Sequence, residues 1–478
     1  MNRSFFCSTA LCFSLLASPA LAEMSSGDGA KKISDAFATY IGTKAIESGA
    51  LKIVPAGDVY RATVDLSSVA GAFASDKGSL KFSAWTFVLA PQNDGTYKVT
   101  SDEGPELSLT GVTPKGKMDE TVKMSGVKFE AIFDPKIMAF PTSKMTVDGI
   151  ETKVVMPEGE VLSHHEKMAY TSTSAGNSDG SVSSKFHQTI ESIAYHMHMV
   201  PVPDKPPVDM NYSIGPLVGD GAVQAMRQRE LMNLVAFMVA HSDKAQLVAE
   251  QDEFKTKLLA LLPLWQNFNA NVSVKDASYT IPSLGPITMK GLGEKIAVTG
   301  LVKSSKLDFG IKLDSLTVPP KIAPDWAAGL VPTDIDINFS LSGADLDQAA
   351  RVAIADLDMS REKPFSDNLN MKLMPIFMTG QQKLVIEPSV LKSSALEIDF
   401  SGEGSFANMA PGLKMTVTAK GLEQVLARLA TVTDPGAKQA LSGLTMAKSL
   451  GKPNADGSTG WLIEISKDGY FVNGQKMR

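Results

Sequence analysis

The chain has 478 residues, with 46 lysines and arginines against 52 aspartates and glutamates, and a formal net charge of −6. Hydrophobic residues make up 44% of it and charged residues 21%, which is typical of globular proteins and excludes disordered and polytopic membrane classes. The acidic balance, without a block of lysines and arginines, argues against a nucleic-acid partner, because phosphates are bound by clustered positive charge.

Residues 1–22 have the features of a secretion signal. Arg3 precedes an apolar run over residues 5–17, and Ala20-Leu21-Ala22 is a small-x-small cleavage site. Cleavage after Ala22 predicts a soluble periplasmic protein without a transmembrane anchor. Both cysteines, Cys7 and Cys12, lie inside this segment, so we expect the mature chain to contain no disulfide and no thiolate ligand.

A first portion, residues 23–215, is expected to be mostly β-sheet. Apolar residues at helical spacing predict one leading helix over residues 30–47. Over residues 58–214, apolar and polar residues alternate in short runs separated by turn dipeptides such as Asp148-Gly149, which predicts an antiparallel meander. The polar stretch over residues 171–184 predicts a long exposed hairpin tip.

A second portion, residues 216–478, is expected to combine helices and strands, with a soft border near Gly215 after four closely spaced prolines. Asp220 is expected to cap a helix, and a second helix is expected over residues 254–262. Alternation returns over residues 267–318. A strand, a glycine and a helix are then expected in succession at Gly343 and again at Gly421. This repeated unit could have arisen by duplication or by convergence.

The chain is expected to end with a helix opened by Asp434-Pro435 and a hairpin turning at Asp468-Gly469. Together these patterns predict an α+β fold dominated by a large, curved, trough-like antiparallel sheet in two sequential portions. About six amphipathic helices are expected to cover or plug its concave face, because open sheets of many strands must hide their apolar side.

Five of the six histidines lie close together in the sequence: His164, His165, His187, His196 and His198. On a strand, His196 and His198 would point the same way and could share a copper or zinc ion. The alternative is a solvated strand face. Because the chain has no nucleophile elbow and no phosphate-binding glycine loop, we expect no enzymatic activity and no cofactor.

Methionine is frequent, with 23 residues, many at apolar positions of expected strands or helices. Its flexible thioether suits either ordinary core filling or a groove for irregular apolar partners.

The C-terminal half carries a resemblance, in its strand-glycine-helix units at Gly343 and Gly421 and in the closing segment DGYFVNGQ, residues 468–475. The chain resembles an uncharacterised family of exported alphaproteobacterial proteins and is more distantly similar to the AsmA-type envelope proteins. The latter resemblance implies a strongly bent sheet with an apolar lining that holds or passes lipid across the periplasm. Those proteins keep an N-terminal membrane anchor, so a chain that sheds its signal would be a soluble carrier or assembly factor.

We therefore expect a non-enzymatic protein of the cell envelope that binds a lipid-like ligand. The expected apolar contacts lie on helices: Leu231, Leu234, Met238, Phe254, Leu258 and Leu426. Two alternatives stay open. One is a structural protein with a packed core and an envelope partner, and the other is metal handling through His196 and His198.

Overall fold

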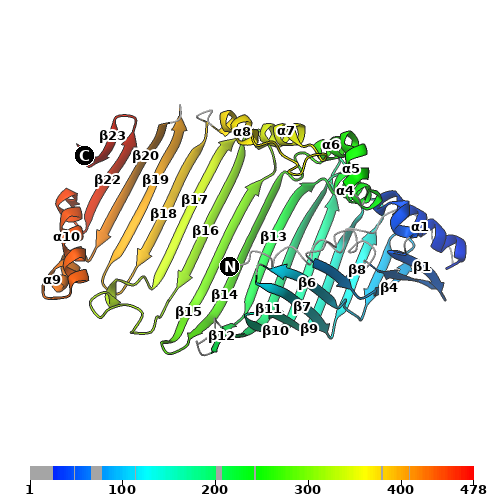
Figure 1. Ribbon diagram of the computed structural model, residues 1–478, viewed down its shortest axis with the longest axis horizontal. Helices are drawn as coiled ribbons and strands as arrows, with labels where there is room; N and C mark the ends of the chain where they lie inside the picture. Colours follow the sequence, from blue (N-terminus) through cyan, green and yellow to red (C-terminus); the bar gives the residue numbers. More distant parts are fainter. Residues whose placement is uncertain are drawn as a thin grey trace. The chain divides into compact units, whose positions relative to one another are not determined.

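The computed structural model describes residues 25–47, 49–65, 78–113, 115–200, 207–241, 244–377, 381–407 and 410–477. The expected secretion signal lies outside these residues. The predicted α+β class, dominated by antiparallel sheet, is confirmed (Figure 1). Contacts divide the chain into two compact units, the first made of residues 1–211, 216–268 and 350–369, the second of residues 212–215, 269–349 and 370–478. The folding border near Gly215 remains a prediction.

The first unit contains most of the short strands and a group of helices. Its elements are α1 (Gly27–Ile41), α2 (Thr43–Glu47), β1 (Leu51–Ala56), β2 (Val59–Val64), β3 (Gly78–Phe82), β4 (Trp85–Pro91), β5 (Tyr97–Ser101), β6 (Leu107–Thr113), β7 (Gly116–Ser125), β8 (Lys128–Asp134), β9 (Ala139–Met156), β10 (Gly159–Gly176), β11 (Val182–Met199), β13 (Leu217–Met226), α4 (Gln228–Ala240), α5 (Lys244–Ala249) and α6 (Gln251–Ala260). Strand β12 (Val208–Ile214) is shared between the two units.

The sheet of the first unit branches at β9. One edge of β9 pairs with β10 along most of its length. On the other edge, residues 139–146 pair with β8 and residues 149–155 pair with β7. The β8 branch continues through β5, β4 and β2 to β1, and the β7 branch continues through β6 to β3. Two separate runs of strands therefore start from the same long strand.

The buried core of this unit is aromatic and lies on the β8 branch. Phe37 of α1 is 2% exposed, and its ring stacks on Phe133 at a centroid distance of 6.3 Å. Phe140 of β9 meets both Phe133 and Phe129 edge to face, at 5.6 and 6.0 Å. Such pairs add to the free energy gained by burying the rings. Helix α1 therefore seals one branch of the sheet.

Three local predictions in this unit are wrong. The helix expected over residues 30–47 is interrupted at Gly42, whose φ of 86° ends α1 before α2 begins. Asp220 does not cap a helix but lies within β13, where its carboxylate pairs with His187. The polar stretch over residues 171–184 is not a long tip. Strand β10 runs to Gly176, β11 begins at Val182, and a hydrogen bond between the hydroxyl groups of Ser174 and Ser184 joins the two strands.

The second unit also combines strands and helices. Its elements are β14 (Asn267–Ile281), which begins at the end of the first unit, β15 (Gly285–Thr299), β16 (Ser305–Asp314), the 3-10 turn η2 (Ala328–Leu330), β17 (Asp334–Ala344), α7 (Leu346–Asp356), which spans the boundary, α8 (Leu369–Phe377), β18 (Lys383–Lys392), β19 (Glu397–Ala407), β20 (Ala410–Lys420), α9 (Leu422–Ala430), α10 (Pro435–Leu450), β21 (Lys452–Pro453), β22 (Thr459–Ser466), β23 (Gly469–Val472) and β24 (Gln475–Lys476).

Strands β15 to β20 of the second unit pair in chain order, and β20 then pairs with β22 and β22 with β23. The predicted start of α10 is confirmed, because the Ala437 backbone N–H donates to the Asp434 carboxylate at 3.1 Å. The predicted terminal hairpin is also confirmed, with Ser466 paired to Gly469. Within this unit, Figure 1 shows α9 and α10 beyond one end of the strands and α8 beyond the other end.

Candidate functional site: an open apolar face

The second unit presents an apolar face, formed by side chains that lie directly opposite one another on neighbouring strands. It is interrupted in one row by Glu294 of β15, which faces Ile311, and by Ser389 of β18, which faces Phe400. Phe309 of β16, for example, faces Ile296 of β15 on one side and Phe339 of β17 on the other. We define the apolar face by four rows across the strands: Val298, Leu307, Leu341, Leu384, Gly404, Leu413, Ile465 and Tyr470; Ile296, Phe309, Phe339, Ile386, Gly402, Met415, Ile463 and Val472; Ile311, Ile337, Phe400, Val417 and Trp461; and Leu292, Leu313, Ile335, Leu391, Ile398 and Ala419.

The opposite face of the same strands is polar, as alternation requires. Lys420 of β20 donates to Glu397 of β19 across the ladder at 3.0 Å. This hydrogen bond, aided by the positive charges of Lys420 and Lys392, holds the pKa of the exposed Glu397 carboxyl below its ordinary value. Lys414 and Glu464 form a further cross-strand pair at 4.0 Å. The face opposite the apolar face therefore carries the charged side chains that favour contact with water.

Most of the apolar face is not covered. Among its residues only Ala419 and Val472 are fully buried, at 5% exposure each, whereas Leu341 is 37% and Tyr470 41% exposed. Every other non-glycine member is partly exposed. In an ordinary two-layer domain such side chains are sealed by a second sheet or by helices. Here α8 and α9 lie beyond the ends of the strands (Figure 1). Helix α10 reaches the face at Trp461, whose indole N–H donates to the Ala447 carbonyl at 2.7 Å.

The fully buried core of the second unit lies elsewhere, at the end of β19 and β20. Val425 and Leu429 of α9 and Ala437 of α10 are 3%, 1% and 0% exposed and pack together. Trp326, Leu330 and other partly buried residues of the preceding loops pack against them. The unit therefore has a small conventional core at the ends of the strands and an uncovered apolar sheet beside it.

The size of the apolar face can be estimated from strand geometry. At about 3.3 Å per residue and about 4.8 Å between strands, a face four rows deep and at most eight strands wide covers up to roughly 20 by 34 Å, or about 700 Å². The largest apolar patch on a typical soluble monomer is about 300–600 Å² and is often functional. The apolar face exceeds that range, so we regard it as the candidate site.

None of the six helical candidates is a member of this face. Leu231, Leu234 and Met238 lie on α4, and Phe254 and Leu258 on α6, all in the first unit, whereas Leu426 lies on α9 of the second. Leu234 is only 8% exposed, and α4 packs against both α1 and α6. Phe254 of α6 stacks on Phe237 of α4 at a ring-centroid distance of 6.0 Å. Their role as ligand contacts remains a prediction.

The predicted common direction of His196 and His198 is visible in their partners on β12. The Nδ1 atom of His196 lies 2.9 Å from Asn211 Oδ1, and that of His198 lies 2.8 Å from Asp209 Oδ1. Both imidazoles are almost half exposed. Within the residues that the structure describes, no group of three or more histidine, cysteine, aspartate or glutamate side chains is arranged to hold a metal ion. Metal binding by this pair stays a prediction.

The other clustered histidines differ in environment. His187 Nδ1 lies 2.7 Å from Asp220 Oδ1, and His164 lies about 4 Å from Glu151 and Glu166, on the exposed side of the strands. His165 points the other way and is partly buried. Burial, reinforced by the positive charge of a protonated His164, lowers its pKa below the ordinary histidine value.

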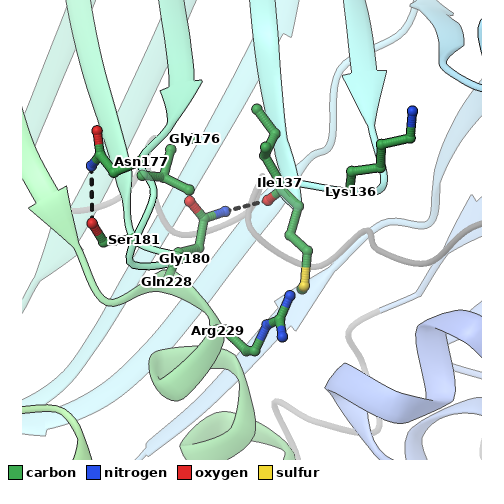
Figure 2. Close-up of a pocket in the computed structure, with 10 residues that line it drawn as sticks. Lys136, Ile137, Gly176, Asn177, Gly180, Ser181, Gln228 and Arg229 are labelled. Carbon is green, nitrogen blue, oxygen red and sulfur yellow. Dashed lines mark hydrogen bonds between the residues drawn. The ribbon is translucent and has the colours of Figure 1, made fainter.

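A separate shallow pocket of about 100 Å³ lies in the first unit (Figure 2). Lys136, Ile137, the hairpin tip between β10 and β11, and Arg229 line it. The Gln228 amide donates to the Met138 carbonyl at 2.5 Å and joins the start of α4 to the turn before β9. Small-molecule sites usually have volumes of about 300–1,000 Å³. This smaller pocket is therefore interpreted as a gap in the packing between elements.

None of the helices in the described part of the chain combines the length and the apolar character needed to cross a membrane. Comparison of the sequence and structure with protein-family models, curated proteins and solved structures finds no match. The candidate function therefore depends on the geometry of the apolar face.

Proposed function

We propose that this protein binds the hydrocarbon chains of lipids on the apolar face of its second unit, without catalysing a reaction. One observation carries the proposal: four rows of mainly aliphatic and aromatic side chains, two of them crossing eight paired strands, lie on one side of the sheet, and most of these side chains are partly exposed. Leaving apolar surface in water is unfavourable by roughly 25 cal/mol for each Å² that remains accessible. A physiological cover for the face is therefore expected.

The chemistry of the face favours chains over compact polar ligands. The two longest rows contain no charged residue, so they offer dispersion contacts and few hydrogen bonds. Each methylene transferred from water to such a surface gains about 0.8 kcal/mol. Because equivalent side chains recur from strand to strand, a bound chain can move along a row without crossing a polar barrier. This arrangement suits a carrier for lipids of varied length.

The proposal includes a location outside the cytoplasm. The expected secretion signal and the similarity to AsmA-type envelope proteins both favour a periplasmic lipid carrier or an assembly factor of the envelope. A periplasmic protein with an uncovered apolar face would meet acyl chains at the surfaces of both membranes. Protein purified from the periplasm should then carry lipid that organic solvent extracts and mass spectrometry identifies.

The decisive experiment places a charge on the face without disturbing the core. Leu341 is already 37% exposed, so Leu341→Glu should fold normally. Its neighbour Ser342, which pairs with Lys306 and Lys383 on the polar face, provides the matched control Ser342→Glu. Binding of palmitate carrying an anthroyloxy fluorophore is measured by fluorescence titration.

We expect Leu341→Glu to weaken binding of that probe at least tenfold, since burying a carboxylate beneath the chain is strongly unfavourable. Ser342→Glu should bind as the wild type does, and both variants should keep the wild-type melting temperature. Equal affinities for all three proteins, or no binding by the wild type, would eliminate the proposal.

A further inference from the structure

Two of the buried polar atoms that lack a hydrogen-bond partner lie side by side on strand β10 of the first unit. Within the residues that the structure describes, the Ser163 Oγ and His165 Nε2 atoms of β10 make no hydrogen bond and are shielded from solvent. Ser163 as a whole is 6% exposed. Native proteins rarely leave buried polar atoms unpaired, and such atoms commonly mark the place of an absent water or ligand.

Both atoms belong to the same side of β10, because alternate residues of a strand share a face. Ser163 lies opposite Thr152 of β9 and Tyr195 of β11. His165 lies opposite Ile150 and Ile193. The rings of His165 and Tyr195 meet edge to face at 6.2 Å. The two unpaired atoms therefore lie on the central strand of three, flanked by Thr152 and Tyr195 at Ser163 and by two isoleucines at His165.

An apolar strip continues from this spot toward the end of the three strands. Val161 pairs with Val154 and Met197, and the next row holds Met156 and Met199 on either side of Gly159. All of these side chains are partly exposed. Methionine adapts to irregular apolar partners. A polar spot with an adjoining apolar strip is the arrangement that recognises an amphiphile.

We propose that this part of the first unit binds an uncharged amphiphile, with the hydroxyl group of its head between Ser163 and His165 and its chain along the strip of Val161, Met197 and Met199. A hydroxyl group donates one hydrogen bond and accepts others, so a single group satisfies the serine and the imidazole together. The ligand class is long-chain alcohols and acylglycerols.

The charge state of the site selects against ionised heads. The lowered pKa of His165 keeps its ring neutral at pH 7, and a neutral ring offers no ion pair to a carboxylate. An ionised head would lose its hydration without compensation. This inference goes beyond the lipid binding proposed for the second unit, because it concerns another set of strands and the polar end of the ligand.

The test follows the histidine signals directly. Histidine labelled with ¹³C gives ring resonances, and His165→Gln assigns the one from His165. Delipidated full-length protein is titrated with 1-dodecanol and, separately, with dodecanoate at pH 7.5. We expect dodecanol to shift the His165 signal in the wild type and Ser163→Ala to weaken this binding about tenfold. Dodecanoate should bind the site at least tenfold more weakly than dodecanol.

Two control variants separate the possible failures. Ser172→Ala removes a hydroxyl on the same strand that pairs with Ser143 at 2.7 Å, and it should not change dodecanol affinity. Leu341→Glu lies in the second unit and should also leave the response of the His165 signal to dodecanol intact. A failure of lipid binding on the apolar face would therefore not affect the site at Ser163 and His165. Removing an unpaired buried hydroxyl should leave the melting temperature of the ligand-free Ser163→Ala protein unchanged or higher.

Three results would overturn the proposal. The first is a His165 signal that does not move with dodecanol, which would mean an ordered water only. The second is equal dodecanol affinity in the wild type and Ser163→Ala. The third is tighter binding of dodecanoate than of dodecanol.

Discussion

Two glycines fix the junctions between strand and helix in the second unit. Gly343 and Gly421 have φ angles of 86° and 87°, in the left-handed region that favours glycine. A Cβ atom at Gly343 would overlap the Gln381 carbonyl oxygen, and one at Gly421 would overlap the Ala395 carbonyl oxygen. The two positions that suggested a repeat in the sequence thus share a backbone conformation and a close backbone neighbour.

We expect Gly343→Ala and Gly421→Ala each to lower the free energy of unfolding by about 2 kcal/mol or more, because the left-handed conformation and the overlap add their costs. Gly443 in the middle of α10 has no neighbour within 4 Å of a built Cβ. Gly443→Ala should therefore raise the free energy of unfolding by about 0.5–1 kcal/mol. Urea unfolding checks all three, and a neutral Gly421→Ala would contradict the assignment.

Tyr97 provides a pH-dependent test of the core in the first unit. Burial, and to a smaller extent the nearby Tyr60, raises its pKa to about 12 from an ordinary value of 10.0. The unfolded chain therefore releases the phenolic proton first as pH rises above 10, and the stability that Tyr97 contributes below that pH is lost as pH approaches 12.

The difference between wild type and Tyr97→Phe isolates this effect from the titration of other residues. Wild-type stability, measured by urea unfolding, should fall more steeply than that of the variant between pH 9.5 and 11.5. Parallel curves would show that Tyr97 titrates as an exposed phenol.

At the scale of elements, replacing a large side chain by alanine should lower the free energy of unfolding more in helices α9 and α10 than in the sheet beside them. Leu429 is 1% exposed inside the small core, whereas Phe339 on the apolar face is partly exposed. Leu429→Ala should cost about 2–5 kcal/mol, the range for a buried leucine. Phe339→Ala should cost less than about 2 kcal/mol despite the larger side chain, because its ring is already partly in water.

Urea unfolding of the two variants measures this difference. Equal or reversed costs would mean that the apolar face is sealed in solution, and the candidate site would lose its basis. The comparison needs no ligand, so it tests the geometry separately from the proposed function.

Alternation and capping were enough to predict most strands and the start of α10, because both signals act within a few residues. The Leu307 to Leu313 alternation of β16 and the Asp434-Pro435 start of α10 are of this kind. Asp220 was misassigned because a carboxylate before an apolar run caps a helix only if the backbone turns there. In the structure Asp220 is a cross-strand partner of His187. Long-range pairing decided its role.

The candidate site itself could not be predicted from the sequence. Alternation is the same whether the apolar side of a strand meets a second layer or remains open, since it reports only which residues share a face. Amphipathic helices suggested apolar contacts on α4 and α6, yet Leu234 and Met232 of α4 are 8% and 1% exposed in a packed interior. Exposure depends on which elements cover a face, and that is a property of the tertiary structure.

For the whole molecule, the apolar face predicts how the protein behaves when its ligand is removed. An open surface of about 700 Å² is close to the area that each partner buries in a stable protein complex, about 800 Å². The net charge of −6 opposes association only weakly once salt screens it. We therefore expect delipidated protein to self-associate as its concentration rises, with a light-scattering mass above that of the 50.9 kDa chain.

Addition of oleate should return the delipidated protein to monomer, because the bound chains cover the surface through which copies associate. Leu341→Glu should remain monomeric at concentrations where the wild type and Ser342→Glu associate, since a carboxylate on the face must be desolvated in any such contact. A delipidated wild type that stays monomeric at all concentrations, and that binds no more of an apolar dye than Leu341→Glu does, would mean that the rows of apolar side chains are covered within the folded chain. The lipid-carrier function would then have no surface on which to act.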